Sequence, residues 1–320
     1  MENYLSLKKV SAYTRRLLAE KKRLGWQRFC ESLSPRSPPT LIWNKIKAYR
    51  RSLLESNVSS NDPMPWLEIF FDNLAPPFVP ESGNFPTQLS PSSDRMNDPF
   101  SLTELSGVLV HLRDSSPGVD GIPYSFICKS PDSSKIMLLK IVNYIFITGS
   151  VPDSWLSQII IPILKPGKDP HDSSSYRPIA LSSVLAKIME NLIKNRLEWL
   201  LENRNLLPNS QFGFRRGKGC LDSLSILSSE IRLAFSRNEN VLGAFLDISA
   251  AYDSVSLPLL RQKMLQLSIP ERMINFICSL LMSRTISIRY FNTSLPPRTV
   301  WKGLPQGSVL SPLLYNIYTF

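Results

Sequence analysis

The feature that most restricts the fold of this 320-residue chain is a short apolar run that ends in one carboxylate. Val241 to Leu246 carries no charged or polar side chain, as expected for a strand that is buried on both faces. Asp247 follows directly, and a carboxylate at the end of such a strand requires a partner, for which a hard cation is well suited. The run therefore predicts a buried strand with a metal-ligand candidate at its end.

The charge of the chain points to a polyanionic partner. Its 37 Lys and Arg and 26 Asp and Glu give a net charge of +11, of which +9 lies in residues 1–60. This net charge suggests a polyanionic partner but does not identify that partner. We expect two basic amphipathic helices, at residues 4–33 and 41–54, which either contact phosphate or present a solvated face.

The cysteines and the apolar segments indicate a location for the chain. Four widely spaced cysteines and two histidines offer no zinc-binding spacing. Reduced thiols and the absence of a signal-peptide core favour a cytoplasmic and nuclear location. The longest apolar stretch, residues 136–147, is interrupted by Lys140 and is too short to cross a bilayer, so no membrane partner is expected.

Residues 61–99 contain eight prolines and predict a mostly extended linker, in which only residues 66–71 could dock. From Phe100 the pattern is globular. Ser101 and Glu104 predict a capping box for a helix at 103–112. Further helices are expected at 124–129 and 134–148, after a tight turn at residues 116–121.

A strand is expected at 158–164, followed by a loop with Lys165 and Lys168 and by the segment Ser175-Tyr176-Arg177-Pro178-Ile179. These cations either bind phosphoryl oxygens or are ordinary loop residues. Ser182 and Ser183 then cap a helix that runs to Leu201, with Met189 and Trp199 expected in the core.

Two later segments combine glycine with polar or basic residues. Residues 211–219 hold glycines, aromatics and cations, a combination that can approach, stack on and neutralise a nucleic-acid strand. A strand at 284–291 and a turn at 292–297 precede Gly303-Leu304-Pro305-Gln306-Gly307-Ser308. Ser311-Pro312 opens a last helix.

Taken together, five of these segments resemble motifs of reverse transcriptases, most closely those of jockey-like non-LTR (LINE-type) retrotransposons. The segments are Pro117–Ile122, Tyr176–Ile179, Gln211–Lys218, Phe245–Asp253 and Leu304–Gly307. The resemblance covers residues 100–320. A group II intron-type enzyme is a less close match across residues 165–179.

The resemblance implies a role for each matched residue. Asp247 would be catalytic and, with the carbonyl of Ile248, would bind Mg²⁺ or Mn²⁺. The incoming dNTP would contact Lys165, Arg177, Tyr252 and Gln306, with the ring of Tyr252 excluding a ribose 2′-hydroxyl. The template grip would consist of Gln211, Phe212, Gly213, Phe214, Arg215, Arg216 and Lys218.

The resemblance also implies an α+β fold with the fingers and part of the palm of a right-hand polymerase. Residues 100–240 would form a fingers-like region and residues 241–320 a partial palm, with an antiparallel sheet backed by helices. The basic helical region at 1–60 and the Pro-rich linker at 61–99 would precede them. The implied partners are an RNA template, a DNA primer and dNTP.

One element of the family pattern is not found. An aromatic-x-Asp-Asp hairpin follows some twenty or more residues after the Gln306 segment in the family, but this chain ends at Phe320 and contains no Asp-Asp dipeptide. Because one carboxylate strand does not hold two ions, we expect a catalytically incomplete fragment of an RNA-directed DNA polymerase, with an exposed sheet edge. A nucleic-acid-binding remnant without catalysis and an unrelated basic globular protein are the other hypotheses.

Overall fold

The computed structural model describes residues 23–32, 64–76, 94–282, 284–291 and 293–320, with a few single residues between 13 and 21. Residues 1–62 and 63–320 form two compact units. In the first unit, residues 23–31 are helical, within the basic helix predicted at 4–33. The helix predicted at 41–54 and much of the predicted linker lie outside the described residues.

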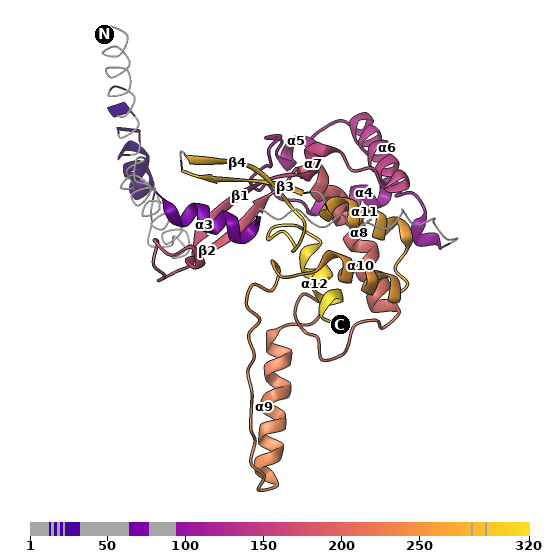
Figure 1. Ribbon diagram of the computed structural model, residues 1–320. Coiled ribbons are helices and arrows are strands. Elements are labelled where there is room, and N and C mark those ends of the chain that lie inside the picture. The colour runs from indigo at the N-terminus through magenta and orange to yellow at the C-terminus, as the bar shows by residue number, and fades with distance from the viewer. Residues whose placement is uncertain are drawn as a thin grey trace. The chain divides into compact units, whose positions relative to one another are not determined.

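The second unit contains a four-stranded sheet with the strand order β2-β1-β3-β4 (Figure 1). β1 (Ser157–Leu164) pairs with β2 (Tyr176–Leu181), and β3 (Arg284–Tyr290) with β4 (Thr293–Val300), both antiparallel. The two central strands, β1 and β3, run parallel. The sheet is therefore mixed. Within residues 241–320, where an antiparallel sheet is predicted, β3 and β4 pair antiparallel, and the parallel pair joins β3 to β1 of residues 100–240.

The β3–β4 hairpin corrects the predicted turn at 292–297. The chain reverses around Phe291, whose φ is +50°, and β4 already begins at Thr293. β4 includes Pro296 and Pro297 because it is an edge strand, where a missing amide donor need not break a ladder.

A helix within the predicted linker packs on this sheet. α3 (Pro65–Leu74) begins with a proline in its first turn, where no amide donor is needed. Trp66 stacks on Tyr176 of β2, with ring centroids 3.9 Å apart and planes 4° from parallel. Arg298 of β4 forms ion pairs with Glu68 and Asp72 of α3. The prediction that residues 61–99 lack regular structure is therefore wrong at residues 65–74, because apolar side chains there find a sheet to cover.

The larger core is helical. Its elements are α4 (Leu102–His111), α5 (Tyr124–Cys128), α6 (Asp132–Thr148), α7 (Asp153–Leu156), α8 (Val184–Asn203), α10 (Leu257–Gln266), α11 (Glu271–Met282) and α12 (Ser311–Thr319). The Ser101–Glu104 capping box of α4 and the Ser183 cap of α8 are confirmed. None of the described helices is long and apolar enough to cross a membrane.

The turn predicted at 116–121 connects α4 to α5 and is confirmed. Gly121 has a φ of +65°, and its amide donates to the carbonyl of Gly118 over 3.2 Å. A Cβ on Gly118 would lie 2.5 Å from the backbone carbon of Ser182. Glycine at 118 therefore lets this turn approach the start of α8.

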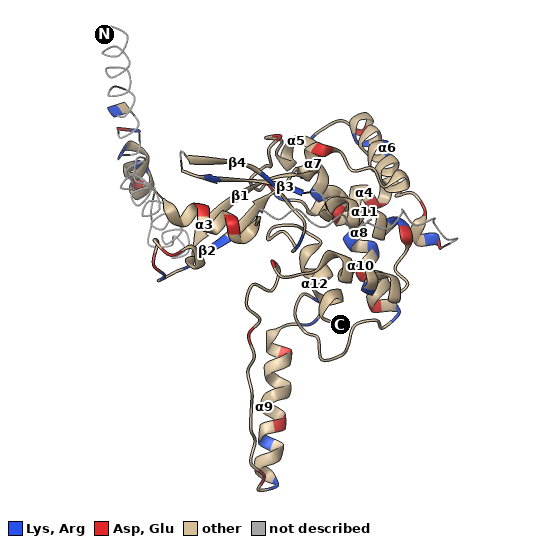
Figure 2. Ribbon diagram, in the orientation of Figure 1, with Lys and Arg blue, Asp and Glu red and all other residues tan. Residues whose placement is uncertain are grey.

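The strand predicted at 241–246 is not formed. Residues 240–248 belong to no helix or strand, and the side chains of Leu242, Phe245 and Leu246 are 98%, 87% and 94% exposed. A strand needs a neighbour to bond its backbone groups, and none of the four described strands pairs with this segment. The preceding α9 (Cys220–Ser236) has no buried residue, although few of its residues are charged (Figure 2).

Replacing Trp66 by alanine is expected to release α3 from the sheet. The change removes the stacked contact with Tyr176 and a buried aromatic side chain, so the free energy of unfolding should fall by about 3 kcal/mol. Urea denaturation followed by circular dichroism measures this change. Ile69→Ala, at an exposed position of the same helix, is the control and should stay within about 0.5 kcal/mol. Equal effects of the two variants would contradict the packing described for α3.

Candidate nucleotide-binding site

The segment predicted to contact nucleotide, residues 303–310, is called here the Gln306 loop. Two backbone hydrogen bonds attach its beginning to the turn that follows the apolar run. The amide of Gly303 donates to the carbonyl of Val255, and the amide of Leu304 donates to the carbonyl of Tyr252, both over 2.8 Å. Gly303 has a φ of +76°, and a Cβ there would lie 3.0 Å from backbone atoms of Asp253. The close approach therefore requires glycine.

The other side of the Gln306 loop is attached to the sheet. The amide of Ala180 in β2 donates to the carbonyl of Gln306 over 2.7 Å. A Cβ on Gly307 would lie 2.5 Å from the carbonyl oxygen of Ala180, and the φ of Gly307 is +128°, so glycine is needed here too. β2 also carries Arg177, so two segments predicted to bind dNTP lie side by side.

A buried carboxylate from α8 fixes the end of the Gln306 loop. Glu190 accepts hydrogen bonds from the Ser308 hydroxyl at 2.5 Å and from the amides of Val309 and Leu310 at 2.7 and 3.2 Å. Burial raises its pKa, and these hydrogen bonds and the nearby ammonium of Lys187 oppose that rise. All three donors bind the same oxygen, Oε2, so one acceptor atom holds three consecutive residues in place.

A small cavity of about 40 Å³ lies beside the Gln306 loop. The residues that line it include Asp253, Gln306, Arg284 and Gln158. Arg284 is buried and donates to the carbonyls of Leu281, Lys302 and Gly303 over 3.1, 2.9 and 2.7 Å. Burial lowers the pKa of Arg284 to about 10, and the neighbouring carboxylates oppose this change.

The side chain of Tyr252 is half-buried next to α12. Its ring centroid lies 5.3 Å from that of Tyr315, with the planes tilted by 51°. Burial raises the pKa of the Tyr252 phenol. Tyr252 directly precedes Asp253 in the chain, and its backbone carbonyl accepts the hydrogen bond from the Leu304 amide of the Gln306 loop.

The proposed metal ligands lie apart from any cluster of carboxylates. Asp247 is exposed, and the side chain of Ile248 is 61% exposed, on the segment that forms no strand. Among the described residues, no three His, Cys, Asp or Glu side chains gather in a way that could hold a metal ion. As they stand, the described residues therefore do not form a site for a divalent ion.

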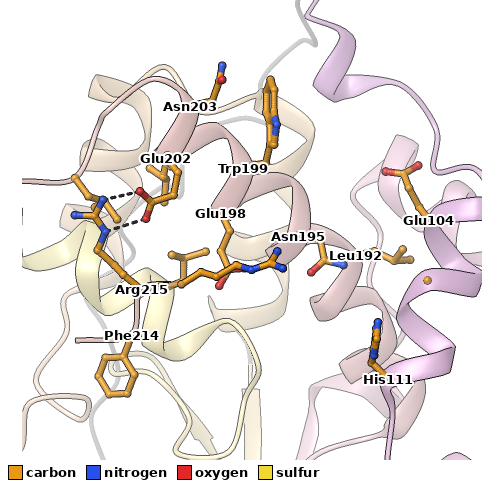
Figure 3. A pocket seen from close by; sticks show the side chains of 15 residues that line it. Glu104, His111, Leu192, Asn195, Glu198, Trp199, Glu202, Asn203, Phe214 and Arg215 are labelled. Carbon is orange, nitrogen blue, oxygen red and sulfur yellow. Dashed lines mark hydrogen bonds and ion pairs between the residues drawn. The ribbon is translucent and has the colours of Figure 1, made fainter. Parts of the chain in front are cut away.

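The predicted template grip, residues 211–218, packs against α8 and α12. Gln211 donates to Asn316 of α12 over 3.0 Å. Arg215 binds both oxygens of Glu202, at 2.8 and 2.5 Å, as the dashed lines in Figure 3 show. Arg215 is thus engaged within the protein, and Glu202 raises its pKa by hydrogen bonding. Lys218 donates to the carbonyl of Asn209 and lies 5.4 Å from the ring centroid of Phe212.

An open groove of about 930 Å³ adjoins this loop (Figure 3). Its lining includes Trp199, Phe214 and Arg216. Trp199 was predicted to fill the core, but 57% of it is exposed, because it lies on the face of α8 opposite the buried stripe. Phe214 is 60% exposed and adopts a φ of +57°, a conformation that non-glycine residues rarely take.

The two cations predicted to face the triphosphate lie on β1–β2. Lys165 follows β1 and donates through Nζ to the carbonyl of Ser174 over 2.8 Å, so its ammonium is held by the loop between the strands. Arg177 is exposed on β2, opposite Ile163 of β1.

Sequence reasoning missed the roles of Glu190, Arg284 and Asn316. Glu190 had a usable signal, since a carboxylate placed four residues after Ala186 and three before Ile193 lies on the apolar stripe of α8. Arg284 is buried and binds backbone carbonyls, although a cation at the start of a predicted strand gives no sign of burial. No local sequence pattern distinguishes Arg284 from the nearby exposed cations Arg289 and Lys302.

Glu190 allows a test of how the Gln306 loop is held. Glu190→Ala leaves three donors unpaired and should lower the free energy of unfolding by about 3 kcal/mol. Glu190→Gln keeps an acceptor oxygen without the buried charge and should stay within about 1 kcal/mol of the wild type. Denaturant titration measures both. A Gln variant as unstable as the Ala variant would contradict this account.

The wild type and Glu190→Gln are also expected to differ in how their free energy of unfolding depends on pH. Because burial raises the pKa of Glu190 in the folded state, the folded chain binds this proton more tightly than the unfolded chain. Relative to Glu190→Gln, the wild type should therefore lose stability as the pH rises from the ordinary carboxyl range through the folded-state pKa. Lys187, Tyr124 and Arg284 also face Glu190, and both proteins retain them.

The chain is similar in sequence to known proteins. Residues 163–319 match the family described as reverse transcriptase (RNA-dependent DNA polymerase). The chain is 30% identical over 321 aligned residues to the RNA-directed DNA polymerase from mobile element jockey of Drosophila melanogaster, covering 94% of this chain and 35% of that protein. It is 36% identical over 204 residues to the probable RNA-directed DNA polymerase from transposon BS of the same organism, covering 64% and 22%.

A more distant relative is the retrovirus-related Pol polyprotein from type-1 retrotransposable element R2 of Popillia japonica. The identity is 27% over 219 residues, covering 68% of this chain and 29% of that protein. The chain thus spans between about a fifth and a third of the length of these curated relatives.

Proposed function

Because this chain belongs to the reverse transcriptases through its residues 163–319, we propose that it binds an RNA template with a DNA primer and positions the incoming dNTP for nucleotidyl transfer. The observation that carries the proposal is the hydrogen bond between Ala180 and Gln306. It joins β2, which carries Arg177, to the Gln306 loop.

Each predicted nucleotide contact has a chemical task. Arg177 and Lys165 would neutralise phosphoryl oxygens, on which negative charge accumulates during transfer. Gln306 would hydrogen-bond the sugar or base through its amide, and Gly307 lets the backbone approach closely. Tyr252 would place its ring against the sugar and reject a 2′-hydroxyl by steric clash.

In this proposal Asp247 and the carbonyl of Ile248 would bind the divalent ion, Mg²⁺ or Mn²⁺. When bound, such an ion would supply neutralising charge to the primer hydroxyl and to the triphosphate. Asp247 is exposed and belongs to no strand, so the segment 240–248 would need contacts that cover it before Asp247 could serve this role. The four free cysteines support a cytoplasmic and nuclear location.

A second function is favoured by the same exposed segment. In this second function the chain binds nucleic acid without catalysis. It is supported by the hydrogen bonds that hold residues 211–218 and the Gln306 loop, whereas the segment with Asp247 forms no strand. The two functions differ in whether the bound complex responds to nucleotide.

A ternary-complex experiment separates them. The purified chain is incubated with a DNA primer annealed to an RNA template and with Mg²⁺, and filter binding is measured with the complementary dNTP or with a mismatched dNTP. Stabilisation of the complex by the complementary dNTP alone supports the polymerase proposal. Binding that falls steeply with salt and ignores both nucleotides supports the second function.

The cations of residues 211–218 are expected to differ in effect. Arg216→Ala should weaken template–primer binding and reduce the salt slope by about 1, because Arg216 is exposed and free to neutralise one phosphate. Arg215→Ala should instead destabilise the loop, because it breaks the bidentate pair with Glu202. Filter binding over a range of salt concentrations, with thermal melting alongside, measures both effects.

Lys129→Ala is the control for these variants, since Lys129 is also exposed but lies at the end of α5. It should leave the salt slope unchanged. If the Arg216 variant behaved like this control, Arg216 would not belong to the nucleic-acid interface.

A further inference from the structure

The helix α6 is apolar on two faces. One face, which includes Val142 and Phe146, is buried in the helical core. On the outer side of the core (Figure 1) lies a second set of apolar residues, whose exposed fractions run from 44% for Ile136 to 65% for Tyr144. These residues, called here the α6 stripe, are Ile136, Met137, Ile141, Tyr144 and Ile147. At about 100° per residue they fall within one arc of about 140° on the helix surface.

An apolar groove of about 610 Å³ adjoins the α6 stripe. It lies between α5 and the beginning of α6, and its lining includes Phe126, Pro131 and Leu138. Leu138 and Ile141 are neighbours on the helix surface, so the groove and the stripe form one surface. Phe126 is 69% exposed, which extends this surface onto α5. A contiguous apolar surface of this kind marks a place where another molecule binds.

The charged residues around this surface are mostly basic. α5 and α6, with the loop between them, carry three lysines and one acid, Asp132, whose carboxylate is already paired with Lys135 over 3.1 Å. Asp114, which lies beside α5, accepts a hydrogen bond from a backbone amide of that helix. Lys129 in the groove lining and Lys140 within the arc of the stripe are exposed, and their ammonium groups suit a carboxylate on a partner.

Two other occupants fit this surface less well. A second copy of the chain, packed antiparallel about the middle of the stripe, would bring the two Lys140 ammonium groups close together with no carboxylate of the stripe to separate them. A bilayer surface would cover the exposed apolar side chains but would not fill a concave groove. A helix with projecting side chains fills such a groove.

We infer that the α6 stripe and the adjoining groove bind an amphipathic helix of another protein. Its apolar face would lie on the stripe, with one large side chain in the groove beside Leu138. Its carboxylates would lie beside Lys129 and Lys140. This surface shares no residue with the segments proposed to bind nucleotide or template, so the inference stands apart from the proposed function.

The test uses the full chain and two synthetic peptides. Both are amphipathic helices of about 18 residues with a leucine face, and their borders carry glutamate in one peptide and lysine in the other. Fluorescence anisotropy measures their affinity for the wild type, for Tyr144→Ser and for Lys140→Glu. Leu221→Ser, at an exposed apolar position of α9, is the matched control. Because all three positions are exposed, thermal melting should show that each variant folds like the wild type.

We expect the glutamate peptide to bind at least about tenfold more tightly than the lysine peptide. Tyr144→Ser should lower its affinity about tenfold, and Lys140→Glu should reverse the preference between the peptides. Leu221→Ser should change neither. The inference would be overturned by equal binding of both peptides, by binding that Tyr144→Ser leaves unchanged, or by no binding of the glutamate peptide at about 1 mM. Should Tyr144→Ser not fold, Met137→Ser tests the same stripe.

Two further measurements separate the other occupants. Binding of the wild type to phosphatidylserine vesicles that is lost in Tyr144→Ser would assign the stripe to a membrane surface. A dimer in light scattering that the same substitution dissociates would assign it to a second copy of the chain. Either result would overturn the inference of a helical partner.

Discussion

The geometry of the candidate site depends on how the Gln306 loop is held between parts of the chain that are far apart in sequence. Residues 252–255, β2 and α8 each bind a different portion of it, through backbone hydrogen bonds or through Glu190. Two glycines, 303 and 307, allow the close approaches. Loss of one attachment would leave the others in place but would free the loop to move where Gln306 must be fixed.

The Gln306 loop is held in part by buried charged side chains, and burying a charge is costly unless the charge is well hydrogen-bonded. Glu190 offsets its desolvation with three donors, and Arg284 offsets its own with three carbonyl acceptors. Both residues bind backbone or hydroxyl groups of particular residues and so impose a geometry that apolar packing alone would not impose. This explains why charged residues occupy positions that the apolar pattern assigns to the core.

Local signals in the sequence predicted most of the helices and the motif residues. They did not predict which segments of the chain contact one another. The Ser101–Glu104 box, the Ser183 cap and the strand at 157–164 follow from short patterns that act within a few residues. The parallel pairing of β1 with β3 and the packing of α3 on the sheet join segments more than 80 residues apart, which periodicity does not reveal. The same limit applies to Glu190, whose charge is visible in the sequence while its three donors lie more than 100 residues away in the chain.

The apolar run at 241–246 has the composition of a buried segment, but no described element covers it. Its composition is that of a core strand, yet its backbone pairs with no described strand and its large side chains are exposed. Burial of a side chain such as Leu242 or Phe245 is worth about 1.5–3 kcal/mol, so ordering of this segment is coupled to whatever covers it. The part of the candidate site around Gln306 is already held in place by hydrogen bonds to β2 and to residues 252–255. The position of Asp247, in contrast, depends on contacts that the described residues do not make.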